Sequence, residues 1–283
     1  MSTWMHTASY FPLWLTLTII MAACTGLSWL LVQIVRRHQT YPQLKENNEF
    51  VGFTYAVYGV IYGVVLAFTI VTAWEHYSDA EHIVMHEATI LSELWRDAGA
   101  FQPEVTIEIH KDIRDYVSSV IEHEWAELSR HGRHSKTTVA AYEALWSNSY
   151  LIHPETKNQE SFLAEYLSKI NELSGTRRLR LMYSSAEING ILWLVMLVGA
   201  VPTIAYTLLF SAKHGWVQVM ITGFMIGLVS LCLLVALCLQ YPFTGRVSVS
   251  VEPFVELAQT LDERAATDAA RMPPVTQQLQ ETR

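Results

Sequence analysis

Apolar residues are concentrated in four long stretches that contain no Asp, Glu, Lys or Arg. The stretches are residues 1–35, 50–74, 188–212 and 214–245. Each holds the roughly 20 apolar residues that cross a bilayer core, whereas a buried helix of a soluble protein usually has only about 10 to 14. The pattern therefore predicts four transmembrane helices, at about 11–35, 51–74, 189–211 and 216–240.

The first apolar stretch also has an alternative interpretation, as a cleaved signal sequence. Met21, Ala22, Ala23 and Cys24 are similar to a lipoprotein cleavage box. A signal sequence normally begins with basic residues, and here none precedes the apolar stretch. Hydrophobicity also continues to Val32, so we expect a retained transmembrane helix.

The spacing of apolar residues between the second and third stretches predicts amphipathic helices. The second transmembrane helix is expected to continue beyond the membrane, since Ala80, Val84, Ala88, Leu91 and Trp95 keep a helical stripe. Further stripes begin at Pro103 and after Pro154, and nothing alternates as a strand would. We expect a first transmembrane hairpin at 1–74, a soluble helical domain at 75–187, a second hairpin at 188–241 and a tail at 242–283. The fold class is an all-α integral membrane protein in which two hairpins flank a helical bundle.

The soluble domain is acidic. Residues 75–187 contain 19 acidic and 11 basic side chains, a difference of 8 negative charges. This sign argues against nucleic acid as a partner, because binding phosphates requires positive charge. The cysteines Cys24, Cys232 and Cys238 all lie in predicted transmembrane helices, so neither a disulfide framework nor a thiol metal motif is expected.

Basic residues near the membrane do not decide the orientation of the chain. Arg36, Arg37, Lys45 and Lys213 lie on the side of the two short connections. Arg177, Arg178, Arg180 and Arg246 lie on the opposite side. Since positive charge normally marks the cytoplasmic side, equal numbers leave the orientation open.

Small residues form a stripe along the second transmembrane helix. At spacings of three and four, Gly52, Ala56, Gly59, Gly63 and Ala67 share one face. Such a face allows close helix approach, either within one subunit or between copies around an axis. Together with Tyr62, these residues are the candidates for helix packing or for lining a pore.

The second transmembrane helix lacks the ionisable groups that active transport normally uses inside a membrane. A passive pore lined by apolar and hydroxyl groups remains compatible with the sequence.

Charged residues beside the membrane supply the other candidate sites. Glu75, Arg177, Arg178 and Arg180 are candidates for a pore mouth, where guanidinium groups would concentrate anions. Contact with lipid headgroups and pairing with acids such as Glu75 or Glu81 together explain the arginines better than a pore mouth does. Asp79, His82 and His86 are weak metal candidates, and an ordinary solvated helix face explains them better.

No catalytic constellation or cofactor motif is visible, so an enzyme is not expected.

Short motifs spread along nearly the whole chain form a recognisable set. They are Asn48-Glu49, Gly52-Phe53, Gly59-Val60-Ile61-Tyr62, Ala67-Phe68, Trp74-Glu75, Glu87-Ala88, Glu124-Trp125, Leu145-Trp146, Arg177-Arg178-Leu179-Arg180, Leu197-Val198-Gly199-Ala200 and Pro242-Phe243. With these motifs the sequence resembles the bacterial bestrophin-like domain family of unknown function. The family is distantly similar to bestrophins, which are pentameric anion channels with four transmembrane helices and cytosolic termini. The resemblance implies a multi-pass protein of the bacterial inner (plasma) membrane with a cytosolic soluble domain.

These observations predict an oligomeric ion channel that passes small inorganic anions passively. A single four-helix subunit is too thin to enclose a pore, so the hypothesis requires a homo-oligomer, and the resemblance implies a pentamer. The alternative is a membrane-anchored sensor or scaffold whose helical domain binds a partner or ligand.

Overall fold

The computed structural model describes residues 13–38, 48–185, 190–210, 212, 214–245 and 247–271, and every regular element in these ranges is helical. The chain divides into two compact units. One comprises Met1–Tyr77 with Glu187–Val247, and the other Ser78–Ala186 with Ser248–Arg283. The predicted start of the first transmembrane helix, and the basic residues Lys45, Lys213 and Arg246, lie outside the described residues.

The first unit contains the helices that cross the membrane. They are α2 (Leu13–His38), the first part of α4 (Asn48–Ala98), α9 (Gly190–Leu209) and α10 (Gly215–Gln240). Among the residues that the structure describes, four helices are long and apolar enough to span a bilayer, which agrees with the predicted number. Helix α4 is one continuous element of 51 residues, so the predicted extension of the second transmembrane helix is confirmed.

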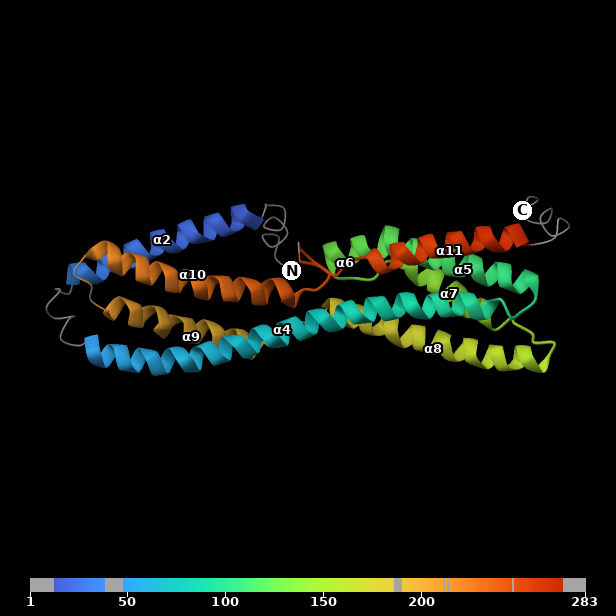
Figure 1. Cartoon of the computed structure of the whole chain (residues 1–283), viewed down its shortest axis with the longest axis horizontal. Coiled ribbons are helices and arrows are strands. Elements are labelled where there is room, and N and C mark those ends of the chain that lie inside the picture. The colour runs from blue at the N-terminus through green and yellow to red at the C-terminus, as the bar shows by residue number, and fades with distance from the viewer. Residues whose placement is uncertain are drawn as a thin grey trace. The chain divides into compact units, whose positions relative to one another are not determined.

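Polar contacts join α2 to α10, which lie side by side in this unit (Figure 1). The Ser28 hydroxyl donates to the main-chain oxygen of Val219 over 2.6 Å. Arg36 Nε donates to Gln218 Oε1 over 3.0 Å, and Arg36 Nη2 donates over 2.7 Å to the carbonyl of Ala212, in the connection that precedes α10. Since a bilayer core offers no water to satisfy polar groups, such bonds hold the helices in register.

The second unit is a helical bundle. Its helices are the remainder of α4, α5 (Pro103–Ser119), a short π-helix η1 (Val120–Glu124), α6 (Trp125–His131), α7 (Lys136–Ser149), α8 (Lys157–Ser185) and α11 (Glu252–Arg271). Pro103 begins α5, where its missing N–H is harmless. Gly132 ends α6 with a φ of 62°, a conformation that glycine adopts readily.

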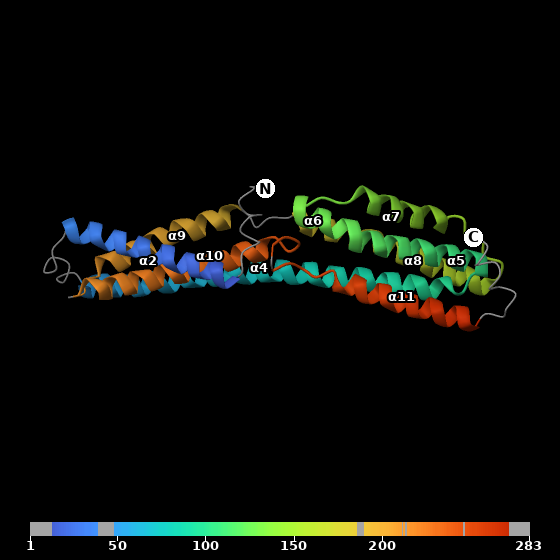
Figure 2. The same cartoon turned by 90° about the horizontal axis from the view of Figure 1, so that it is seen from above.

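The C-terminal helix α11 belongs to the bundle unit. It contacts α5 and η1, and Phe254 and Leu261 are fully buried. Figure 2 shows α11 running alongside the bundle helices. Residues that follow the fourth transmembrane helix in sequence therefore complete the core of the domain that precedes the third.

Candidate functional site

Tyrosine side chains connect the membrane part of α4 to α9. The hydroxyls of Tyr58 and Tyr62 donate to the main-chain oxygens of Gly199 and Met196, over 3.1 and 2.9 Å. The Tyr62 side chain is only 6% exposed, so this predicted pore or helix-packing candidate packs inside the subunit. Both acceptors lie in α9 just before Pro202, so the two bonds hold α4 against this part of α9.

The contact between Tyr62 and α9 depends on a glycine. A Cβ atom added at Gly199 would lie 2.5 Å from the Tyr62 ring atoms Cδ2 and Cε2. That separation is far below the usual contact distance of about 3.5–4.0 Å between carbon atoms. The absence of a side chain at Gly199 therefore lets the ring lie directly against the helix backbone.

The small-residue stripe of α4 is largely unoccupied within the subunit. No described atom lies within 4 Å of a Cβ added at Gly59 or Gly63. Ala56 and Ala67 are exposed, while Gly52 lies against the Phe210 ring. Packing within one subunit therefore does not explain the stripe at Gly59 and Gly63, and the face is available to another molecule.

Beside this stripe, α4 exposes large apolar side chains on the face opposite Tyr62. Val60, Val64 and Phe68 are 68%, 49% and 70% exposed. Residues 50–74 carry no Asp, Glu, Lys or Arg. This part of α4 thus has one face bound to α9, a flank of small residues, and an open face that is apolar and uncharged.

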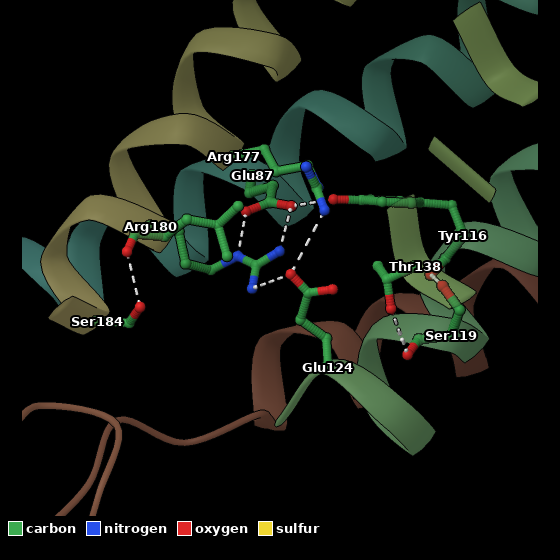
Figure 3. A network of polar contacts seen from close by, with 9 residues as sticks. Glu87, Tyr116, Ser119, Glu124, Thr138, Arg177, Arg180 and Ser184 are labelled. Atoms are coloured by element: carbon green, nitrogen blue, oxygen red, sulfur yellow. Dashed lines mark hydrogen bonds and ion pairs between the residues drawn. The ribbon is translucent and has the colours of Figure 1, made fainter. Parts of the chain in front are cut away.

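A buried cluster of charged side chains lies inside the bundle unit (Figure 3). Arg180 Nε and Nη2 donate to the two carboxylate oxygens of Glu87, over 2.6 and 3.2 Å. The Tyr116 hydroxyl donates to Glu87 Oε1 over 2.6 Å. Glu124 Oε1 lies 3.6 Å from Arg180 Nη1 and 3.5 Å from Arg177 Nη2. Four helical elements, α4, α5, η1 and α8, supply these groups.

The cluster is electrostatically balanced, with two carboxylates facing two guanidinium groups. Burial alone would lower the pKa of Arg180, but the neighbouring Glu87 carboxylate, Tyr116 and Glu124 raise it overall. Burial, with the Glu87 charge, raises the pKa of Tyr116 well above its ordinary value. Arg180 therefore stays charged and Tyr116 stays neutral at physiological pH.

The three arginines predicted at a pore mouth have different surroundings. Arg177 and Arg180 are buried, and their partners are Glu124 and Glu87 rather than the acids Glu75 or Glu81 considered from the sequence. Arg178 is exposed, and so is Glu75 in the membrane unit. An electrostatic effect at a pore mouth thus stays a prediction, with Arg178 as its exposed guanidinium.

The weak metal candidates have side-chain partners on α8. Tyr183 donates to Asp79 Oδ2 over 3.2 Å, and His86 Nε2 lies 3.0 Å from Glu172 Oε1. Neither these residues nor the exposed His82 belong to a group of three or more potential ligands within the described residues. The geometry does not bring Asp79, His82 and His86 together as a metal centre.

Glu87, Glu124 and Tyr116 were not among the sequence-based site candidates. Glu87 follows the apolar stripe of α4, and its type and spacing resemble those of exposed acids on the same helix. A buried carboxylate requires a charged partner, and here that partner is 93 residues away in sequence. The helical periodicity does indicate that positions 84, 87, 88 and 91 share a face, which is the one available signal.

Comparison with solved structures identifies the fold. A bacterial bestrophin homologue from Klebsiella pneumoniae aligns with a TM-score of 0.60 and 13% identity, over 85% of this chain and 96% of that chain. A point variant of that homologue aligns with a TM-score of 0.63 and 14% identity, over 85% of this chain and 98% of that one. At these identities the likeness concerns the fold alone. A search of curated proteins finds no significant match.

The sequence itself matches a known domain family along most of its length. The match covers residues 19–254, which include most of α2, the other three membrane-crossing helices and the bundle up to the start of α11. It confirms the resemblance noted from the motifs between Asn48 and Phe243. The chain belongs to the Bestrophin-like domain family.

Proposed function

We propose that this protein forms an oligomeric ion channel in which α4 lies nearest the central axis. Membership of the Bestrophin-like family supports a channel-type membrane protein. The observation that carries the proposal is that no other described helix of the subunit packs against Gly59 and Gly63. A membrane helix whose small residues are exposed is suited to close packing against a neighbouring helix. A second copy of this chain is the simplest neighbour.

The open apolar face of α4 then lines the pore. Val60, Val64 and Phe68 are exposed in the subunit and point away from α9, so symmetric copies would place them around the axis. Apolar constrictions gate channels by excluding water when narrow. A passive channel of this kind needs no ionisable group in the transmembrane part of α4, in agreement with the uncharged stretch at 50–74.

We propose small inorganic anions as the permeant ions, a soluble domain in the cytosol, and the bacterial inner membrane as the location. Bestrophin-like membership supports these points through the anion channels that the family resembles. Of the three arginines that the sequence placed at a pore mouth, two do not supply free positive charge there. Carboxylates neutralise Arg177 and Arg180 inside the bundle. Arg178 is the remaining exposed member of the trio.

The direct test is ion flux through purified protein in liposomes. Vesicles carrying a chloride gradient should release chloride, and vesicles with only a cation gradient should not. Replacing Val64→Ser should increase flux, because a hydroxyl lowers the barrier to wetting. Leu30→Ser is the matched control, since Leu30 is 50% exposed on α2 and should leave flux unchanged. If vesicles with the well-folded unaltered protein and vesicles with well-folded Val64→Ser both release no ions, the protein is not a channel. Selective release of cations would exclude only the proposal that the permeant ions are anions.

The alternative function is a sensor or scaffold in which the bundle binds a partner. Its support is the continuity of α4, which contributes residues to both units and could transmit a displacement along its length. Labelling of an introduced cysteine at exposed Glu122 in intact cells distinguishes the two. Labelling from outside would favour a sensor, whereas protection until the cells are opened is expected for the channel.

A further inference from the structure

A π-helical turn interrupts the rod formed by α5 and α6. Within it the N–H of Trp125 donates to the carbonyl of Val120, five residues earlier instead of four. A π-turn amounts to one extra residue in an α-helix, and such turns are rare and frequently lie at functional sites. The Thr138 hydroxyl of α7 donates over 3.1 Å to the carbonyl of Ser119, at the start of the turn.

The last residue of the π-turn is the loosely held member of the buried ionic cluster. Glu124 is fully buried, yet neither of its carboxylate oxygens has a hydrogen-bond partner in the described structure. Its contacts with Arg177 and Arg180 are 3.5 and 3.6 Å long, beyond the usual 2.7–3.2 Å range of a hydrogen bond. Glu87, by contrast, accepts three hydrogen bonds from Arg180 and Tyr116, over 2.6, 3.2 and 2.6 Å.

The carboxylate of Glu124 is therefore held to its polar neighbours by attraction between charges and not by hydrogen bonds. In a buried environment the Coulomb energy persists at distances where hydrogen bonding is weak. The groups that face Glu124 are Arg177 and Arg180 of α8, with Glu87 of α4 and Tyr116 of α5 behind Arg180. If Glu124 lost its charge, both guanidinium groups would keep their positive charge and the turn would lose this attraction.

The residue after Glu124 connects the turn to the C-terminal helix. Trp125 Nε1 donates to the Val249 carbonyl over 3.3 Å, and its ring lies 5.9 Å from that of Phe254 in α11. The Arg180 guanidinium lies 5.7 Å from the Trp125 ring and 6.0 Å from the Phe254 ring. Returning the turn to α-helical form would rotate α6 by about 100° and shift it by about 1.5 Å. That movement would remove Trp125 from α11.

We propose that η1 is a register switch, held in its π form by the Glu124 carboxylate between Arg177 and Arg180, whose release undocks α11 from Trp125. The switch belongs to the bundle unit alone and does not depend on whether the protein conducts ions. Its two states differ in one hydrogen-bond register, and the charge on Glu124 sets their balance. A change in the charge on Glu124 is thereby converted into the docking or release of the C-terminal helix α11.

Hydrogen exchange of the full-length protein in detergent, read by mass spectrometry, tests this proposal. Glu124→Gln removes the charge while preserving shape. We expect exchange to rise by about tenfold in residues 120–131 and 252–261, with 157–170 of α8 unchanged. Removing Ile121 deletes the extra residue of the turn, so that η1 can form only the α-helical register. In the protein that lacks Ile121, Glu124→Gln should therefore not change the hydrogen exchange of α11.

Three results would overturn the switch. The first is unchanged exchange in both segments after Glu124→Gln. The second is an equal rise in every bundle helix, which indicates general destabilisation. The third is an undiminished effect of Glu124→Gln after removal of Ile121. If Glu124→Gln does not fold, Thr138→Val replaces it, because loss of the hydroxyl bonded to Ser119 should affect the same two segments by about threefold. An unaffected Thr138→Val protein would then count against the proposal.

Discussion

The two units of this protein place polar and apolar groups in opposite ways. In the membrane unit the apolar side chains Val60, Val64 and Phe68 point outward, and hydroxyls of Tyr58 and Tyr62 join helices from within. In the bundle unit most charged side chains lie at the surface, beside some exposed apolar ones such as Leu151 and Met182, and the centre contains apolar side chains together with two buried ion pairs around Arg180.

The difference follows from the surrounding medium. Lipid does not drive apolar helix faces together, so contacts between membrane helices depend on close approach and hydrogen bonds. Water drives apolar burial in the bundle, and charged groups inside it persist only when paired. A side-chain contact in the bundle should therefore contribute more to stability than a similar contact in the membrane unit.

The largest expected effect is loss of the buried guanidinium in Arg180→Ala. Breaking a buried ion pair leaves Glu87 without its partner and should destabilise the bundle by about 3–5 kcal/mol. Denaturant unfolding followed by tryptophan fluorescence measures this change. Arg178→Ala is the matched control, since that side chain is exposed and should change stability by no more than about 0.5 kcal/mol. Equal losses in the two variants would contradict the buried pairing.

The same chemical change in both units makes the comparison sharper. Tyr116→Phe removes a hydrogen bond to the Glu87 carboxylate and should cost about 1.5–3 kcal/mol. Tyr62→Phe removes a bond to the Met196 carbonyl within the membrane, where about 0.6 kcal/mol is typical. Unfolding of both variants in the same detergent provides the measurement. A larger loss for Tyr62→Phe would reverse the conclusion about the two media.

Gly199→Ala tests close helix approach in the membrane unit. The added methyl group would collide with the buried Tyr62 ring, and overpacking of this kind costs about 1–3 kcal/mol. Thermal unfolding in detergent checks the loss. Gly190→Ala is the control on the same helix, because its Cβ would meet no described atom within 4 Å. Equal stability of the two variants would mean that the ring moves aside freely.

The smallest effect on the isolated subunit is expected from Gly63→Leu, since the space around Gly63 is open. The effect should appear in assembly, with subunit association weakened by about tenfold as the close helix contact is lost. Detergent-corrected light scattering or native mass spectrometry reports the oligomer. Gly26→Leu on α2 is equally open and should leave assembly intact. Dissociation by Gly26→Leu alone would place the interface on α2 instead of α4.

Several features of the fold could be predicted from local pattern. Four charge-free stretches determined the number of membrane helices, and the apolar stripe from Ala80 to Trp95 predicted the long α4. The acidic, helical character of residues 75–187 followed from composition and periodicity. These predictions succeeded because the length, charge and residue spacing of a segment can be read without knowing which other segments it contacts.

Other features required the packed molecule. Spacing put Gly59 and Tyr62 on one helix, but only the position of α9 shows that Tyr62 faces inward while Gly59 stays open. The π-turn at Val120–Glu124 interrupts a stripe that reads as one ordinary helix. The stripe does contain one step of five residues, from Val120 to Trp125, but only the backbone hydrogen bond between them shows that the extra residue forms a π-turn.

The sequence by itself determined which segments enter lipid and which stay in water, because that partition depends on the summed hydrophobicity of each segment. It also identified Arg177, Arg178 and Arg180 as a concentrated positive charge. Only the tertiary structure decided that two of them are buried against Glu124 and Glu87. The physical reason is that the energy of a charge depends on the groups within a few ångströms of it, and those groups come from helices far apart in the chain.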